Sequence, residues 1–171
     1  MDARLTFLGY NICMRFLCDE MLAGLARWLR AAGHDADMAE PGEADRTLLE
    51  RARNQGRTLL TRDRAILQIK DAANVATILE TQGLDAWAQE LRERHGVDWL
   101  AHPFTRCLMC NVDLVDAGPE TLARMPEDSR ALPGPFRACP KCHRGYWPGS
   151  HVKRMRTRLE RFAGHGHGET P

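Results

Sequence analysis

Four cysteines form two pairs, and in each pair two residues separate one cysteine from the next. The pairs are Cys107/Cys110 and Cys139/Cys142, with 28 residues between them. Four thiolates at this spacing suit a tetrahedral zinc ion, and since every ligand is protein sulfur, no position remains open for a substrate. We therefore expect a structural zinc ion, whose binding adds folding free energy to a segment with little apolar core. A redox dithiol pair and unpaired cysteines are the alternatives.

Three aspartates lie at the ends of expected strands or the start of an expected helix. Asp19 follows an apolar strand at residues 14–18, Asp63 follows a strand at residues 58–61, and Asp45 opens a helix. Each is a suitable helix N-cap, which is the simpler interpretation of any one of them. The carboxyl ends of parallel strands share one sheet edge, where ligands bind, so we expect Asp19 and Asp63 to meet there, and the start of the helix at Asp45 can lie beside them. Clustered carboxylates repel unless a cation lies between them. Oxygen ligands favour magnesium or manganese, which can assist hydrolysis of a phosphodiester.

The elements that position these residues follow from hydrophobic periodicity. Strands are expected at residues 14–18, 36–39, 58–61 and 75–79, and helices at residues 21–32, from 45 to near 55, around 66–67, and from 84 to near 96. Strands that alternate with helices predict a small α/β domain with a parallel sheet covered on both faces. We place this domain at residues 14–100. A ribbon module with a basic C-terminal helix is expected at residues 101–163.

Composition and charge narrow the class of protein. The chain has 171 residues, 43% hydrophobic and 27% charged, as in globular proteins. No apolar run reaches the ~20 residues that a membrane span requires, and no export signal is evident, so we expect a cytoplasmic protein. Residues 14–80 carry 10 Lys/Arg against 11 Asp/Glu, whereas residues 101–171 carry 11 against 7. The basic excess, concentrated at residues 151–161, is compatible with contacts to phosphate.

The two ends of the chain are set apart from this core. Residues 1–13 are expected to be a flexible extension, with a short strand at residues 5–8 as the alternative. Residues 164–171 are expected to be a flexible tail, although His165, His167 and Glu169 have a spacing that can bind metal.

Several motifs together resemble the Mut-seven C-terminal RNase family. They are FLCDEML at 16–22, LARWLR at 25–30, TRD at 61–63, FTRCLMCN at 104–111, CPKC at 139–142 and YWPGSH at 146–151, followed by the basic helix. The resemblance covers roughly residues 14–162, nearly the whole chain. It implies a PIN-like nuclease domain with a C-terminal zinc ribbon, and an acidic cluster that binds magnesium or manganese and cuts RNA.

Matched residue by residue, the resemblance assigns the acidic positions to Asp19, Asp45 and Asp63. The further acid of larger PIN domains has no counterpart in this short chain, so one metal ion is expected rather than two. Glu20 is a possible substitute, and Asp71 is a weaker one.

Candidate substrate contacts are less specific. Arg27 and Arg30 share a helical face and, with Arg62 beside Asp63, are candidates for contact with a scissile phosphate; solvated surface is the alternative. Trp28 and Trp87 fit core positions. Tyr146 and Trp147 can either stack on a base or cover the small core of the ribbon.

We therefore predict a metal-dependent ribonuclease with a structural zinc ribbon that assists RNA binding. Two other classes remain open: a non-catalytic module that binds RNA or the ribosome, and a protein-interaction adaptor. The sequence leaves the RNA substrate, endo- or exonucleolytic cutting and the oligomeric state open.

Overall fold

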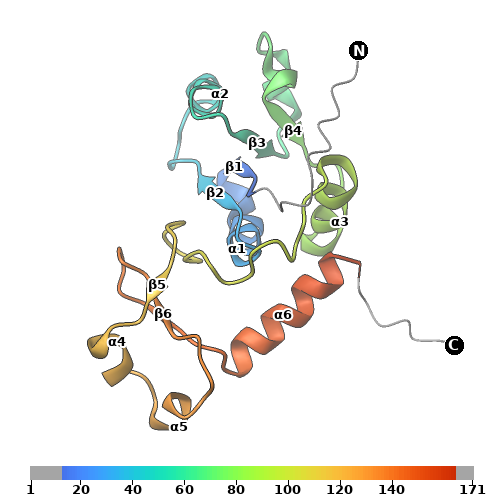
Figure 1. The fold of residues 1–171 in the computed structure, drawn as a ribbon. Coiled ribbons are helices and arrows are strands. Elements are labelled where there is room, and N and C mark those ends of the chain that lie inside the picture. Colours follow the sequence, from blue (N-terminus) through green and yellow to red (C-terminus); the bar gives the residue numbers. More distant parts are fainter. Residues whose placement is uncertain (1–12, 165–171) are drawn as a thin grey trace, which may run out of the picture.

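A parallel sheet of four strands forms the centre of the molecule (Figure 1). The computed structural model describes residues 13–164. The strands are β1 (Arg15–Cys18), β2 (Asp35–Met38), β3 (Thr58–Thr61) and β4 (Ala76–Ile78), in the spatial order β2-β1-β3-β4. The predicted α/β fold is thus confirmed. The alternative strand at residues 5–8 and the possible ligands His165, His167 and Glu169 lie outside the described residues.

Helices cover both faces of this sheet because the strand side chains alternate between them. Phe16 and Cys18 of β1 belong to one apolar cluster and Leu17 to the other. The first face packs against α1 (Ala23–Ala31), which follows a 3₁₀ turn η1 (Glu20–Leu22), and against α3 (Leu84–His95) and α6 (Ser150–Phe162). The second face packs against α2 (Asp45–Asn54) and the 3₁₀ turns η2 (Arg64–Gln68) and η3 (Ala72–Asn74).

A smaller antiparallel sheet, in the order β5-β6-β7, lies next to the turns that carry the four paired cysteines. Its strands are β5 (Val115–Asp116), β6 (Arg137–Ala138) and β7 (Gly145–Tyr146), and we call residues 105–147 the ribbon. Two short helices that the sequence analysis did not predict, α4 (Pro119–Ala123) and α5 (Glu127–Arg130), lie between β5 and β6.

Helix α6 returns from the ribbon to the α/β layers (Figure 1). Its apolar residues Met155, Leu159 and Phe162 are buried in the cluster that also contains α1 and α3. The Phe162 ring contacts those of Trp99 and Trp28, with centroid separations of 5.0 and 5.4 Å. The core therefore continues across the boundary expected near residue 100. Among the described residues, no helix has both the length and the apolar character that crossing a bilayer demands.

The turn after α1 brings the N-terminal strand, the α1 C-terminus and residues 98–102 together. Gly33 has a φ of 96°, and a Cβ there would collide with the backbone of His102. The fully buried His34 ring accepts a hydrogen bond from the Met14 N–H at Nδ1 (3.2 Å). Its Nε2 lies 2.9 Å from the Asp98 carbonyl oxygen, which accepts the remaining ring proton. The ring is therefore held in its neutral form.

This buried ring predicts a loss of stability at mildly acidic pH. Burial lowers the pKa of His34 below its usual value of 6.5. The unfolded chain therefore takes up a proton that the folded chain does not, and the free energy of unfolding decreases as pH falls below about 6.5, by up to ~1.4 kcal/mol per pH unit. Urea unfolding at several pH values gives the free energy of unfolding as a function of pH. Its slope against pH should be smaller for His34→Gln than for the parent, with zinc content monitored throughout. Because burial also lowers the pKa of His95, the difference in slope is the test. Equal slopes would assign the effect to other groups.

Candidate active site and metal centre

Asp19 and Asp63 lie at the carboxyl edge of the sheet, as predicted, after the neighbouring strands β1 and β3. Thr61, the last residue of β3, is 1% exposed and connects them. Its hydroxyl donates to Asp19 Oδ2 (2.7 Å) and accepts the backbone N–H of Asp63 (3.0 Å). The Asp19 N–H in turn donates to the Leu60 carbonyl (3.0 Å). This shared hydroxyl fixes the orientation of one Asp19 oxygen.

Asp63 combines the two roles that its sequence position allows. Its Oδ1 accepts the Ala65 N–H (2.8 Å), so this aspartate caps η2. Its Oδ2 has no hydrogen bond or ion pair with the described residues, and the side chain is exposed. One oxygen of Asp63 is therefore used for the cap and the other is available to a ligand.

Asp45 is the first residue of α2, and Ala44 occupies the cap position. The contact between Glu20 and the Gly42 N–H holds the loop before Asp45 against the residue that follows Asp19. Within residues 13–164, only the four cysteines bring three or more potential ligand atoms within 4.8 Å of one another. Asp19 and Asp63 therefore follow neighbouring strands and Asp45 begins α2, but the three carboxylates do not form a closed ligand cluster.

The three candidate arginines occupy different surroundings. Arg62 lies over the Trp87 ring, 5.8 Å from its centroid, and the Trp87 N–H donates to the Thr81 carbonyl. Arg27 is exposed on α1 and lines a cavity beside the ribbon.

Arg30 is buried, and its guanidinium donates to the carbonyls of Ala36 (2.7 Å), Leu108 (3.0 Å) and Met109 (3.0 Å). Arg30, expected at a phosphate, instead joins α1 to β2 and the ribbon.

Replacing Arg30 tests this structural role. Arg30→Met removes three donors and leaves buried carbonyls unpaired, so we expect the free energy of unfolding to fall by about 3 kcal/mol. Arg27→Met, one turn earlier on the same helix, is the matched control and should change stability little because Arg27 is exposed. Denaturant unfolding of the zinc-loaded proteins measures both. Equal stability of Arg30→Met and the parent would contradict the role.

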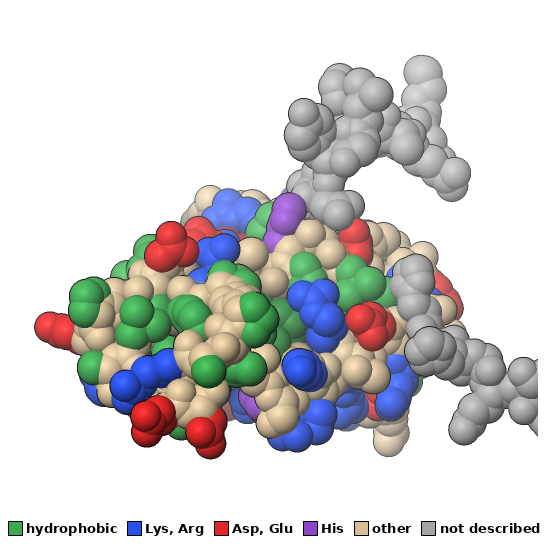
Figure 2. Space-filling view, turned by 60° about the horizontal axis from the view of Figure 1, so that its bottom comes forward, with side chains coloured by type: hydrophobic (Ala, Val, Ile, Leu, Met, Phe, Trp, Pro, Cys, Tyr) green, Lys and Arg blue, Asp and Glu red, His purple; other side chains and the backbone are tan. Residues whose placement is uncertain are grey.

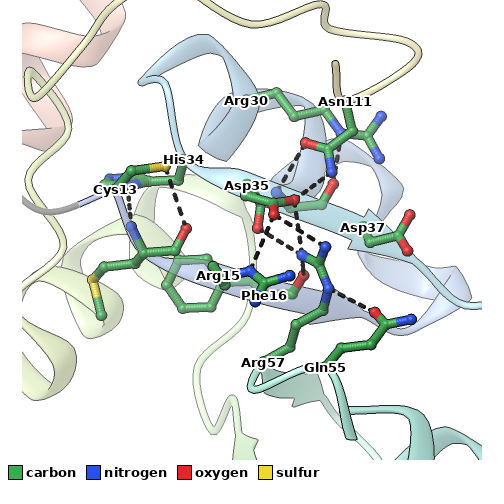
Figure 3. Close-up of polar contacts among 12 residues, drawn as sticks. Cys13, Arg15, Phe16, Arg30, His34, Asp35, Asp37, Gln55, Arg57 and Asn111 are labelled. Carbon is green, nitrogen blue, oxygen red and sulfur yellow. Dashed lines mark hydrogen bonds and ion pairs between the residues drawn. The ribbon is translucent and has the colours of Figure 1, made fainter. Parts of the chain in front are cut away.

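A polar network attaches the ribbon to the free edge of β2 (Figure 3). Asn111 accepts the Ala36 N–H (3.0 Å) and donates to Asp35 Oδ1 (2.6 Å). The Arg57 guanidinium contacts both Asp35 oxygens, at 2.8 and 3.0 Å. Burial raises the pKa of Asp35, but the hydrogen bonds from Arg57 and Asn111 outweigh it and leave that pKa below its usual value. The ribbon is thus fastened to the sheet on the side of β2.

The four cysteines lie in two turns of matching geometry. The N–H of Cys107 donates to the Val112 carbonyl and that of Cys139 to the Arg144 carbonyl, five residues ahead in each case. Asn111 and His143, which follow the second cysteine of each pair, have positive φ values of 58° and 57°. The Cys107 and Cys142 sulfurs are 3.8 Å apart, close to the separation of about 3.8 Å that a tetrahedral site with ~2.3 Å Zn–S bonds requires. The cluster can hold a metal ion such as zinc.

Tyr146 supports this centre from β7. Its hydroxyl lies 3.2 Å from Cys107 Sγ and accepts the Leu108 N–H (3.1 Å). Burial raises the pKa of the Cys107 thiol, but hydrogen bonds from Tyr146 and from the backbone at Cys110 outweigh it and lower that pKa to about 6. A readily ionised thiol is suited to metal binding. Tyr146 therefore covers the small core of the ribbon, which is one of the two roles expected for it from the sequence.

The motifs found in the sequence agree with a family comparison. The model of the Mut7-C RNAse domain matches residues 14–159. The chain belongs to the Mut7-C RNase domain family. This membership indicates a nuclease-like function, with RNA as the substrate class named in the family description.

Other comparisons define how far this Mut7-C chain resembles known proteins. It is 34% identical over 103 residues to the protein named exonuclease mut-7 homolog of Homo sapiens, a match that covers 58% of this chain. The chain spans only 12% of that relative's length. No solved structure matches it.

Thr61 and Asn111 are site residues to which the sequence analysis assigned no role. The pattern Thr-x-Asp indicates the local hydrogen bond from the Asp63 N–H to Thr61. No local signal points to the Thr61–Asp19 bond, because it depends on the pairing of β1 with β3.

Proposed function

We propose that this Mut7-C chain is a metal-dependent ribonuclease that hydrolyses phosphodiesters of RNA. The observation that carries the proposal is the pairing of Asp19 and Asp63 through Thr61 at the carboxyl edge of the sheet. Ligands of open parallel sheets bind at this edge. The family membership makes RNA the substrate class to test.

The acidic residues fit magnesium or manganese bound largely through water. Magnesium is held by one or two carboxylates and keeps several waters, so a closed cage of three acids is not required. Asp19 and Asp63 each have one oxygen without a partner among residues 13–164. Asp45 is the candidate third acid. When bound there, the ion supplies a water of lowered pKa and neutralises charge on the phosphate.

The residues of the chain have separate parts in this proposal. Thr61 holds Asp19 with one oxygen fixed, and the cap at η2 holds Asp63. Arg62 places a positive charge beside Asp63. The basic residues of α6 and the ribbon add sequence-independent contacts to the RNA backbone.

We propose a structural role for the zinc ion at the four cysteines. The apolar cluster of the ribbon has only three buried members among the described residues, Cys107, Leu114 and Cys139, and two of them are ligands. A segment with so small a core depends on the metal for its stability.

A second candidate function is a non-catalytic RNA-binding module. It is favoured by the absence of a three-acid cluster among residues 13–164 and by the use of Asp63 as a cap. In this function the ribbon and α6 bind RNA without cleavage.

An RNA cleavage assay separates the two functions. The zinc-loaded chain is freed of magnesium and manganese by dialysis, since a strong chelator would also remove the zinc. It is then incubated with end-labelled single-stranded and hairpin RNA, with and without each ion. The ribonuclease proposal expects products only when magnesium or manganese is added. Salt-dependent binding without products would support the second function, and neither binding nor cleavage would support the protein-interaction adaptor.

A further inference from the structure

Trp147, which follows β7, lines three adjoining cavities, two between the ribbon and α6 and a third within the ribbon. The first, of about 160 Å³, also has Phe104, Tyr146 and Met155 in its wall. Its volume is close to the ~150 Å³ of an engineered apolar cavity that holds benzene. A single planar ring is therefore a suitable occupant.

Two glycines leave the indole accessible. A Cβ at Gly149 would lie 3.1 Å from the indole nitrogen of Trp147, and one at Gly145 would lie 3.5 Å from its six-membered ring. The indole N–H groups of Trp87 and Trp99 donate to backbone carbonyls. That of Trp147 has no acceptor within the described part of the chain, so it can donate to a ligand.

Every Lys, Arg, Asp or Glu side chain around the three cavities is an arginine, and two histidines lie among them. Arg27, Arg144 and His151 line the first cavity, and Arg137 and Arg156 line the second. The third is lined by Arg124 and His143 in addition to Arg144. No Asp or Glu of residues 13–164 lines any of the three. Figure 2 shows hydrophobic side chains gathered over the ribbon, with Lys and Arg beside them over α6. The surface therefore favours a ligand that is anionic as well as planar.

We infer that the Trp147 surface binds an unpaired nucleotide of single-stranded RNA, with the base against the indole and the phosphates beside the arginines. The inference rests on the proposed function for the identity of the polymer. Aromatic rings stack on unpaired bases, whereas a duplex keeps its bases stacked internally. An acidic peptide would use the arginines but not the open indole ring.

Helix α1 connects this surface to the acidic edge. It begins at Ala23, four residues after Asp19, and Arg27 lines the first cavity one turn further on. The rise from Ala23 to Arg27 is roughly 6 Å. A single strand held at Trp147 is thereby placed to extend along α1 toward Asp19 and Asp63.

Binding measurements without catalysis test the inference. The zinc-loaded chain carrying Asp19→Asn is titrated, without magnesium or manganese, into a fluorescein-labelled uridine decanucleotide, and anisotropy gives the dissociation constant. Trp147→Ala should weaken binding by about tenfold to a hundredfold while leaving the salt dependence unchanged, because one stacked base is lost and no phosphate contact. Arg144→Ala should instead reduce the slope of log K against log salt by about 0.7. Val115→Ala, at an exposed apolar position of the ribbon outside the cavities, is the control.

Fluorescence quenching and competition by polyglutamate are two further tests of the same site. If Trp147→Ala alters zinc content or circular dichroism, quenching of tryptophan fluorescence by the oligonucleotide is compared between the parent and Trp147→Phe. Loss of the quenched component supports the inference, and unchanged quenching overturns it. Equal RNA affinity of Trp147→Ala and the parent also overturns it, as does displacement of the RNA by polyglutamate with the same potency in both. Trp147-dependent binding by a chain that never cleaves RNA would reject the ribonuclease proposal and leave this site standing.

Discussion

Asp19→Asn should lower RNA cleavage by at least about a hundredfold while leaving the fold and bound zinc unchanged. The substitution keeps the shape of the side chain, and the amide oxygen can still accept the Thr61 hydroxyl. It removes the negative charge that the proposed function assigns to binding of the divalent ion, whose stabilisation of the reaction is worth several kcal/mol. Each ~1.4 kcal/mol corresponds to a factor of ten in rate. Initial rates at saturating magnesium or manganese, with circular dichroism and zinc analysis, measure the effect.

Asp128→Asn is the matched control for this prediction. Asp128 is exposed in α5 and is not a candidate for the acidic site, so the substitution makes the same change of charge elsewhere in the chain. We expect its cleavage rate to equal that of the parent. Undiminished cleavage by Asp19→Asn would exclude the proposed chemistry at this edge. A comparable loss in Asp128→Asn would show that the assay responds to net charge instead.

The strands and most helices follow from local patterns in the sequence. Residues 58–61 are predicted and observed as β3, and the start of α2 at Asp45 is also as expected. These elements were predictable because apolar periodicity and glycine stops act over a few residues. The α4–α5 segment is different, because it is short and contributes only two buried residues, Thr121 and Met125. Its helices leave no long periodic signal.

The roles of single polar residues depended on contacts distant in sequence. Arg30 lies 78 residues from the Leu108 carbonyl that it contacts, and Asn111 lies 76 residues from Asp35. Residue type and spacing place Arg30 on a helix beside Arg27. They do not reveal that the ribbon carbonyls cover it, which is why a phosphate contact was expected. The pairing of Asp19 with Asp63 was foreseeable, since it follows from the parallel sheet itself.

Cys139→Ser should abolish zinc binding and unfold the ribbon. Structural zinc binding contributes about 10–16 kcal/mol in small zinc domains, which is comparable to the ~5–15 kcal/mol total stability of a typical protein. Cys139 is 1% exposed and is one of the three buried members of the ribbon cluster. Its loss therefore removes both a ligand and part of a core that has little else to replace it.

Cys13→Ser makes the same chemical change away from the cluster and is the control. Cys13 is exposed, and its Sγ hydrogen-bonds the Met14 and Gly33 carbonyls among the described residues, which a serine hydroxyl can also do. Zinc analysis should give one ion per chain for Cys13→Ser and none for Cys139→Ser. Chymotrypsin should cut rapidly after Tyr146 in Cys139→Ser alone, because Tyr146 loses its contact with Cys107 when the turns separate. A protease-resistant ribbon without zinc would show that the hydrogen bonds of Arg30 and Asn111 are sufficient to keep the ribbon folded. The metal would then have no structural role.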